Sequence, residues 1–351
     1  MADTPAGTGS GSGPGTESGL TVAVTGPTGT FGAGLVPLLE ADDRVARVIG
    51  IARRPFDPAE RGWSKMTYRR GDVRDLDTLR QAVDGADVVV HLAFLITGNA
   101  ARSTTRSVNV QGTLNAFRAA AFAGARRFVH ASSVAAYGFS PTNPVGMTED
   151  QPVRPAARLF YAQEKAELEQ RLSEAATAFP GIALYLVRPS IVLGPQAVGA
   201  KDVLPGPLAP LGRRLAGLAT RRLPLPLPVA VPALPLQFVH QDDVGSALLA
   251  CVLGEGPPGA YNIAGDGVLT LADVAREYGA LPLRLPPGPT RLAARAMARA
   301  PLLPPAAQWV EALGAPAVMD TTKAREQLGW RPRYTGLQAL RATLRRGDPA
   351  D

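Results

Sequence analysis

The chain of 351 residues is poor in the residue types that build disulfides and metal centres. It contains one cysteine, Cys251, so an intramolecular disulfide is impossible. Its three histidines, His91, His130 and His240, lie far apart in the sequence and lack the spacing of a zinc site. These shortages exclude a disulfide-stapled scaffold and predict a protein without a metal site.

Lysine is also scarce, since the chain has only Lys65, Lys165, Lys201 and Lys323 and its other basic residues are arginines. Basic residues outnumber acidic ones by 37 to 30, which gives a formal net charge of +7. The charges are scattered rather than gathered into a basic run with interleaved aromatics, which argues against nucleic-acid binding. The excess of positive charge instead favours attraction of anionic small molecules.

The sequence contains no long, uninterrupted run of apolar residues. Residues 223–241 carry no charge, but they contain five prolines, which disfavour a membrane-spanning helix. We expect a loop or substrate lid there. Residues 1–19 hold six Gly, three Ser and three Thr and predict a disordered tail. The tail lacks the pattern of a signal peptide, so we expect a cytoplasmic protein.

Strand and helix patterns alternate through the first half of the chain. Apolar or β-branched runs lie at 21–25, 47–51, 87–92, 127–132 and 182–187, a further strand could lie at 68–72, and helical patterns lie at 33–40, 76–83, 109–123 and 161–176. Alternation of this kind predicts parallel βαβ units, and continuously apolar strands predict a sheet covered on both faces. We therefore predict an α/β fold with a doubly wound, Rossmann-type parallel sheet over residues 20–190. A smaller substrate-binding region should follow over 191–346, partly interleaved with the first domain.

Three glycines lie at the junction between the first predicted strand and the first predicted helix. Gly26 permits a tight turn, Gly29 lets backbone approach a pyrophosphate, and Gly32 allows close packing of helix on strand. The start of the helix would present free N–H groups to the phosphates. The residues predicted to bind the cofactor here are Gly26, Thr28, Gly29, Thr30, Phe31 and Gly32.

The Gly-x-x-Gly-x-x-Gly spacing resembles that of the extended branch of the short-chain dehydrogenase/reductase family. Further motifs follow in the family's order: Gly71-Asp72-Val73, His91-Leu92-Ala93-Phe94, Asn109-Val-Gln-Gly-Thr113, Ser132-Ser133 with Tyr137-Gly138, Tyr161-x-x-x-Lys165 and Arg188-Pro189-Ser190-Ile191. The resemblance implies that Asp72 and Val73 meet the adenine ring. It also implies that the remaining cofactor contacts are Leu92, Ala93, Phe94, Ser132, Pro189 and Ile191. Phe94 departs from the small residue common in the family, and Asp72 could also cap the following helix.

A candidate catalytic pair lies on the predicted helix over 161–176. Tyr161 and Lys165 are four residues apart and therefore share one helix face. A nearby ammonium favours the phenolate, so Lys165 should lower the pKa of Tyr161 and make it an acid/base near neutral pH. The resemblance adds that Lys165 reaches the nicotinamide ribose, that Ser133 holds the substrate oxygen and that Asn109 organises the site.

The end of the second strand bears on the choice of cofactor. An acidic residue there would bind the ribose hydroxyls of NAD, whereas an arginine would accommodate the 2′-phosphate of NADP. The sequence has Ala52 followed by Arg53 and Arg54, and a guanidinium binds phosphate bidentately. We expect NADP(H), held by Arg53 and Arg54, with NAD(H) as the alternative.

Together the motifs predict an enzyme, an NAD(P)-dependent oxidoreductase that transfers a hydride between NADP(H) and a carbonyl or alcohol carbon. If the stretch 223–238, which is poor in charge, lines the pocket, it favours a small, rather apolar substrate; the alternative is that it packs as core. Two alternatives stay open: an NAD(P)-dependent epimerase or dehydratase acting on a nucleotide sugar, and a non-enzymatic NADP-sensing protein. The resemblance also allows a homodimer through the helices that carry Asn109 and Tyr161.

Overall fold

The computed structural model describes residues 19–96, 102–140, 142–156, 159–197, 228–285 and 316–345. Almost all of the predicted N-terminal tail and the first part of the predicted lid, residues 223–227, lie outside these ranges.

A central sheet of seven parallel strands forms the core of the molecule, in the order β11-β6-β5-β4-β1-β2-β3. The strands are β1 (Leu20–Thr25), β2 (Val45–Ala52), β3 (Met66–Arg70), β4 (Val88–His91), β5 (Arg127–Ala131), β6 (Ala183–Pro189) and β11 (Gly259–Ile263). This is the predicted doubly wound, Rossmann-type sheet. The strand order reverses between β1 and β4, and ligands of such sheets bind at the carboxyl ends of the strands beside that point.

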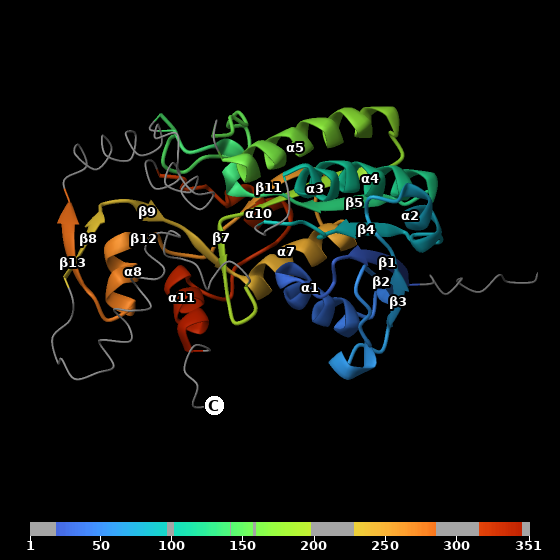
Figure 1. Ribbon diagram of the computed structural model, residues 1–351, viewed down its shortest axis with the longest axis horizontal. Coiled ribbons are helices and arrows are strands. Elements are labelled where there is room, and N and C mark those ends of the chain that lie inside the picture. The colour runs from blue at the N-terminus through green and yellow to red at the C-terminus, as the bar shows by residue number, and fades with distance from the viewer. Residues whose placement is uncertain are drawn as a thin grey trace, which may run out of the picture.

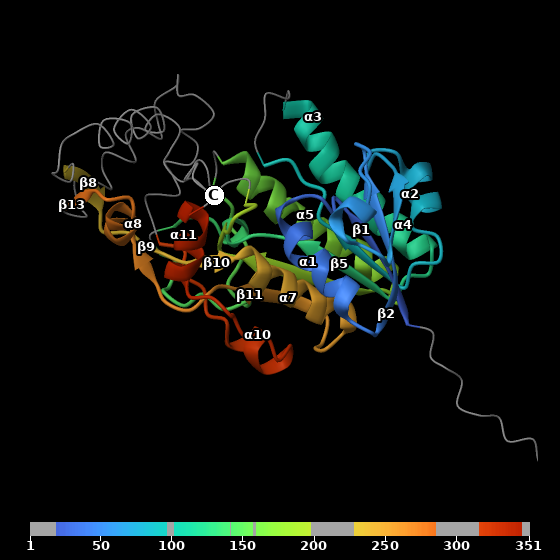
Figure 2. The ribbon, with the colours of Figure 1, turned by 90° about the horizontal axis from the view of Figure 1, so that it is seen from below.

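Helices cover both faces of the sheet, as Figures 1 and 2 show. On one face lie α1 (Thr30–Ala41) and α7 (Gln241–Leu253), and on the other α2 (Leu76–Ala82), α4 (Gly112–Phe122) and α5 (Phe160–Ala178). Because successive residues of a strand point to opposite faces, Val22 and Val24 are buried under α1 and α7 while Ala23 is buried under the other helices. Two apolar layers therefore fix the sheet between the helices.

The helix that carries Asn109 begins earlier than predicted. A short helix α3 (Arg102–Arg106) leads into a π-helical turn, η2 (Ser107–Gln111), which continues directly as α4. The first turns of this helix are polar, so a prediction based on apolar periodicity misses them. Single π-helical turns are frequent at functional sites, and this one holds Asn109 in the buried interior.

The remaining elements are short, and most of them gather at one end of the central sheet (Figure 1). Three two-stranded sheets pair β7 (Ile191–Leu193) with β10 (Phe238–His240), β9 (Pro235–Leu236) with β12 (Leu269–Thr270), and β8 (Pro228–Pro232) with β13 (Leu281–Leu285). Short helical elements are η1 (Ala59–Arg61), η3 (Val134–Tyr137), α8 (Leu271–Glu277), α10 (Thr322–Gln327) and α11 (Gly336–Arg345). No helix in the described ranges is both long and apolar enough to cross a membrane.

The described part of the segment 223–241 differs from the expected loop or substrate lid. The described part of 223–241 forms the short strands β8, β9 and β10, with prolines at strand ends and edges, where a missing N–H is tolerated. Further on, α7 and β11 return to the central sheet, where α7 packs on α1 and β11 pairs with β6. The sequence hides β11 because its five residues include a buried asparagine, Asn262, and form no continuous apolar run.

Candidate active site

The loop between β1 and α1 requires glycine at two of the predicted positions. Gly26 has a φ of +69°, and an added Cβ would lie 3.0 Å from the backbone nitrogen of Ala93. At Gly32 an added Cβ would lie 2.0 Å from the carbonyl oxygen of Pro27, so a larger residue would force the loop and helix apart. The loop is therefore held tightly against the carboxyl end of β1 and the chain after β4.

The first turn of α1 fits a phosphate group. Gly29 is the N-cap residue, no side chain caps the helix, and its first turn contains no acidic residue. The first N–H groups of a helix have no partners within the helix and, with the helix dipole, favour an anion. Thr28 is exposed, Thr30 donates to the carbonyl oxygen of Gln196 at 3.2 Å, and Phe31 packs against the core. These residues could hold the pyrophosphate of a dinucleotide.

Two arginines directly follow the end of β2. Arg53 and Arg54 are both exposed and directly follow Ala52, the last residue of the strand. Arg53 is close enough to Asp72, beyond the neighbouring strand β3, to help lower the pKa of that carboxyl group. The predicted contacts from the ends of β2 and β3 thus lie near each other.

Asp72 and Val73 have clear local roles. Asp72 forms an ion pair with Arg74 at 2.6 Å, and this hydrogen bond is the main cause of its lowered pKa. The suggestion that Asp72 caps the following helix is wrong: Asp75 is the N-cap residue of α2, and its Oδ1 accepts N–H groups from the first turn. Val73 is buried beneath Gly112 of α4, where an added Cβ would lie 2.5 Å from its side chain.

A buried hydrogen-bond chain fixes the point where the strand order reverses. The hydroxyl of Thr25, at the end of β1, accepts from the N–H groups of Leu92 and Ala93 and lies 2.9 Å from Nδ1 of His91. Nε2 of His91 lies 3.0 Å from the hydroxyl of Thr113 on α4. Burial lowers the pKa of His91 to about 3, so the ring is neutral and each nitrogen has one partner. Sequence reasoning did not assign this role to Thr25, His91 or Thr113.

Asn109 joins the chain after β4 to α5. Its Oδ1 accepts from the N–H of Leu95 at 2.8 Å, and its Nδ2 donates to the carbonyl oxygen of Leu95 at 3.0 Å. The same Nδ2 donates to Oε2 of Glu164 at 2.7 Å. The side chain thus holds the segment that contains Leu92, Ala93 and Phe94, and its bonds go to Leu95 and Glu164.

Ser133 and Tyr161 meet at the carboxyl end of β5. The hydroxyl of Ser133 caps η3 by accepting the N–H of Ala135 at 3.2 Å, and it shares a hydrogen bond with Tyr161. The Tyr161 ring packs edge-on against Phe94, with ring centroids 5.7 Å apart. Two of the predicted catalytic side chains are therefore in direct contact.

Lys165 lies beside this pair and is 2% exposed. Its Nζ donates to the carbonyl oxygen of Ala131 at 2.7 Å and lies 3.5 Å from the centroid of the Phe94 ring. Burial lowers the pKa of Lys165 to about 7, although Glu169 and Glu164 act in the opposite direction. A side chain in this state can exchange a proton near neutral pH.

The pKa of Tyr161 departs from the expectation. Burial raises it, and the hydrogen bond from Ser133 only partly opposes that effect. Nζ of Lys165 lies 5.9 Å from the Tyr161 ring centroid and donates a hydrogen bond to the carbonyl oxygen of Ala131. In this arrangement Tyr161 keeps its proton near neutral pH and is set up as an acid.

Ser132 and the segment after β6 complete the set of predicted residues. Ser132 is 1% exposed, and its hydroxyl donates to Oε1 of Glu169 on α5. Pro189 is buried at the end of β6, while Ile191 is 41% exposed at the start of β7. The chain from Pro189 to Ile191 therefore crosses the same carboxyl edge of the sheet.

Sequence reasoning missed a buried ion pair behind the site. Glu169 binds Arg188 of β6 through Nη2 at 2.5 Å and Nε at 2.9 Å. Nη1 of Arg188 donates to the hydroxyl of Tyr137 at 2.6 Å, and that hydroxyl donates to Asn262 at 2.8 Å. Glu169 lies four residues after Lys165 and therefore shares its helix face. This spacing in the sequence could have indicated that Glu169 belongs to the surroundings of Lys165.

Comparisons with known proteins indicate the family to which the sequence is similar. The sequence model of the NAD dependent epimerase/dehydratase family matches residues 22–264, more than half of the chain. An uncharacterised protein of Mycobacterium tuberculosis is 29% identical over 326 residues, which cover 91% of this chain and 82% of that protein. Sterol demethylase protein B of Methylococcus capsulatus is 33% identical over 181 residues, covering 50% of this chain and 52% of that one.

Solved structures share the fold across nearly the whole chain. DesIV, a dTDP-glucose 4,6-dehydratase from Streptomyces venezuelae with NAD and TYD bound, has a TM-score of 0.69 at 22% identity, covering 93% of this chain and 96% of that one. The Bordetella bronchiseptica enzyme WbmG, in complex with NAD and UDP, has a TM-score of 0.67 at 20% identity, covering 95% and 96%. The chain belongs to the NAD dependent epimerase/dehydratase family, in agreement with the resemblance of its motifs to extended short-chain dehydrogenases/reductases.

Proposed function

We propose that this protein transfers a hydride between NADP(H) and a carbonyl or alcohol carbon of a small, apolar substrate. The observation that carries the proposal is the contact of Ser133 with Tyr161, with Lys165 beside them, at the same sheet edge as the phosphate loop. When bound, the nicotinamide supplies or accepts the hydride. The side chains supply the proton and hold the reacting oxygen.

Each side chain has a distinct role in the reduction direction. Tyr161, whose pKa is raised by burial, holds its proton and donates it to the carbonyl oxygen. The hydroxyl of Ser133 holds that oxygen and stabilises the negative charge that grows on it. Lys165 in its ammonium form would hold the ribose hydroxyls of a bound dinucleotide, and Asn109 keeps the chain after β4 in place.

The surroundings of Ser133 favour simple redox chemistry over dehydration. Removal of water from a sugar requires a further acid or base that protonates the departing hydroxyl. The residues that follow Ser133 are Val134, Ala135 and Ala136, which are apolar and buried. The two buried carboxylates of α5 near Lys165 are already bound, Glu164 by Asn109 and Glu169 by Arg188.

The rim of the site supports an apolar substrate. Ile96, just beyond the segment held by Asn109, is 47% exposed, and Ile191 on the crossing segment is 41% exposed. Large exposed apolar side chains beside a reacting centre favour an apolar ligand. The chain is similar to sterol demethylase protein B, whose name refers to a sterol, and this similarity also favours an apolar substrate.

The second candidate is an epimerase or dehydratase of a nucleotide sugar. It is favoured by the fold shared with DesIV and WbmG, whose structures contain NAD together with TYD or UDP. The preference for NADP(H) rests on Arg53 and Arg54 after Ala52, whereas these neighbours bind NAD. An NADP-sensing protein without activity would have no need for the contact between Ser133 and Tyr161.

Two measurements test the proposal. Titration of the full chain with NADPH and NADH, followed by nucleotide fluorescence, should show tighter binding of NADPH. With NADPH bound, a panel of apolar ketones that includes a ketosteroid should show oxidation of NADPH in proportion to the alcohol formed. Conversion of a UDP- or dTDP-sugar without net change in the nicotinamide, together with a preference for NADH, would overturn the proposal in favour of the second candidate.

A further inference from the structure

Glu169 is a buried carboxylate that the proposed reaction does not use. It lies on α5, one turn after Lys165 and two turns after Tyr161, so the three side chains share a helix face. Only 4% of Glu169 is exposed. Burying a carboxylate is costly unless its oxygens are paired and hydrogen-bonded, so its contacts have to be accounted for.

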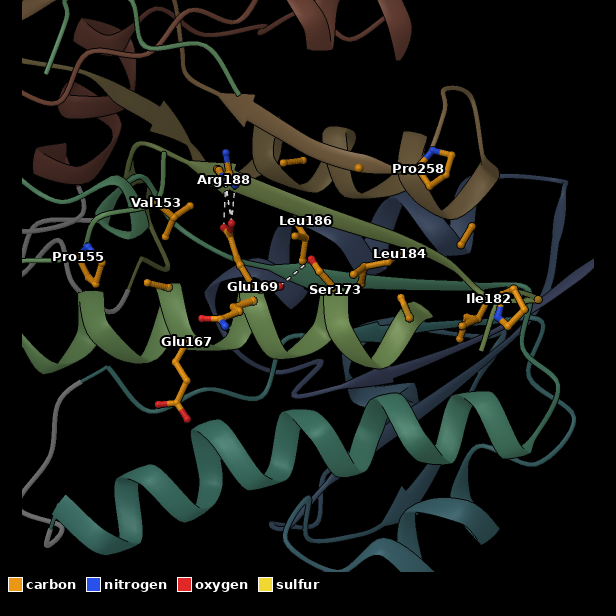
Figure 3. Close-up of a pocket in the computed structure, with 18 of the residues that line it drawn as sticks. Val153, Pro155, Glu167, Glu169, Ser173, Ile182, Leu184, Leu186, Arg188 and Pro258 are labelled. Carbon is orange, nitrogen blue, oxygen red and sulfur yellow. Dashed lines mark hydrogen bonds and ion pairs between the residues drawn. The ribbon is translucent and has the colours of Figure 1, made fainter. Parts of the chain in front are cut away.

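The contacts of Glu169 join three elements. Ser132, just after β5, donates its hydroxyl to Oε1, and Arg188 of β6 donates to both carboxylate oxygens. Figure 3 shows Glu169 pointing from α5 to Arg188 and Glu167 pointing to the other side of the helix; both carboxylates line a cavity of about 1010 Å³. One carboxylate thereby fixes the face of α5 that bears Lys165 against the ends of two neighbouring strands.

Stability alone is a weak reason for such an arrangement. Replacing a buried ion pair by well-packed apolar residues is often neutral or stabilising, because desolvation of both charges offsets their attraction. A buried ion pair is better explained as a means of fixing the register of two elements against each other. Here the register decides whether Tyr161 reaches Ser133 and whether Lys165 reaches the carbonyl of Ala131.

The charges around Lys165 point to a second effect. His91 on β4 and His130 on β5 face it and are neutral, because burial lowers their pKa values well below the ordinary range. Tyr161 is protonated, and Arg188 is bound to Glu169. The negative groups are Glu164 and Glu169, and Glu169 has the larger effect on the pKa of Lys165.

We propose that Glu169 is a positioning residue of the Tyr161–Lys165 pair: its carboxylate docks α5 onto the ends of β5 and β6 and holds Lys165 as an ammonium. The inference rests on the proposed function, since it concerns the same site. It assigns a role to a residue that touches neither the reacting oxygen nor the hydride.

The test follows the titration of Lys165 directly. The chain has only four lysines, so NMR of isotope-labelled lysine side chains gives few signals, and Lys165→Met identifies the relevant one. Glu169→Gln keeps the shape of the side chain and removes its charge. We expect the midpoint of Lys165 to fall by about one pH unit, the lower end of the shift caused by a nearby opposite charge. The alkaline limb of kcat/KM should move to lower pH with it.

Glu167→Gln is the matched control. Glu167 lies on the same helix but forms exposed ion pairs with Arg106 and Arg171 and points away from Glu169 and Arg188 (Figure 3). This variant should leave the Lys165 midpoint unchanged. Glu169→Asp, which keeps the charge on a shorter side chain, should preserve the midpoint and lower kcat, because it cannot span Ser132 and Arg188.

A folded Glu169→Gln protein with an unmoved Lys165 midpoint would overturn the inference, even if its activity fell. If the single variant fails to fold because Arg188 is left as a buried, unpaired cation, Glu169→Gln combined with Arg188→Gln is compared with Arg188→Gln alone, so that the difference in the Lys165 midpoint still reports the charge of Glu169. The NMR readout needs no turnover. A shifted midpoint in a protein that reduces no ketone would therefore refute the proposed function and retain the link between Glu169 and Lys165.

Discussion

The aromatic ring of Phe94 covers the ammonium group of Lys165, with Nζ 3.5 Å from the ring centroid. The same ring meets Tyr161 edge-on, so one side chain contacts both members of the candidate catalytic pair. A cation over an aromatic face gains about 0.5–2 kcal/mol, more where water is excluded. Phe94 therefore has two opposed effects on Lys165: it excludes water, and it attracts the charge.

Two substitutions of Phe94 should move the pKa of Lys165 in opposite directions. Phe94→Ala admits water and weakens the burial that lowers the pKa to about 7, so the pKa should rise. Phe94→Leu keeps the site dry and removes the aromatic face, so the pKa should fall by up to about one unit. NMR titration of labelled lysine measures both. Shifts of the same sign, or none, would show that the ring does not control Lys165.

Tyr161→Phe tests the assignment of the proton donor. Loss of a positioned acid lowers turnover by about 10²–10⁴-fold, while the affinity for the dinucleotide should stay within a factor of two. Tyr185→Phe is the control, since that hydroxyl donates to the carbonyl of Gly256 and lies outside the site. A Tyr161→Phe enzyme that reduced its ketone at the parent rate would assign the proton to another group.

The fold could be predicted because the signals for it are local. Most of the first six strands of the sheet are apolar runs, although β3 is Met-Thr-Tyr-Arg-Arg, and the glycine loop lies at the first junction between strand and helix. β11 could not be found in this way, since a five-residue strand that contains Asn262 looks like a loop until its partner β6 is known. The start of the helix before Asn109 was hidden for a related reason, because its first turn is polar and exposed.

The candidate site could be predicted as a list of residues, but its electrostatics could not. The spacing of Tyr161 and Lys165 correctly places both on one helix face. It suggested that the ammonium lowers the pKa of Tyr161, whereas burial raises it. Burial and the pull of the Ala131 carbonyl on Lys165 arise from packing between α5 and β5, which no spacing along the chain reveals.

Arg53 and Arg54 should determine the preference for NADPH. Both are exposed at the end of β2, and hydrogen bonds from charged groups contribute about 1.5–3 kcal/mol each. Replacement of both by alanine should weaken NADPH binding by at least about tenfold, equivalent to 1.4 kcal/mol, and leave NADH binding unchanged. Nucleotide fluorescence titration measures both constants.

The control for this pair is Arg80→Ala. Arg80 is also exposed, but it lies on α2 over the ring of Phe122, so its replacement removes one positive charge elsewhere, as each single replacement of Arg53 or Arg54 does. It should leave both nucleotide affinities unchanged. An equal loss of NADPH binding in the control would mean that net charge, and not a phosphate contact, attracts the nucleotide.

Two buried histidines should make the protein sensitive to mild acid. The rings of His91 and His130 stack with centroids 5.9 Å apart, and burial lowers both pKa values, that of His91 to about 3. In the unfolded chain both titrate near the ordinary value of about 6.5. Below that pH the unfolded state binds protons that the folded state does not, so stability falls as the pH falls.

Between pH 7 and pH 5.5 each histidine should reduce the free energy of unfolding by about 1 kcal/mol. His130→Phe should remove its share of that loss, and it should also stabilise the protein at pH 7. The second effect follows because neither ring nitrogen of His130 has a hydrogen-bond partner among the described residues, and an unsatisfied buried donor costs about 1–3 kcal/mol. Urea denaturation of both proteins at the two pH values measures both effects. If His130→Phe were less stable at pH 7 and kept the full loss at pH 5.5, the histidine would have to be bound to a group that repays its burial.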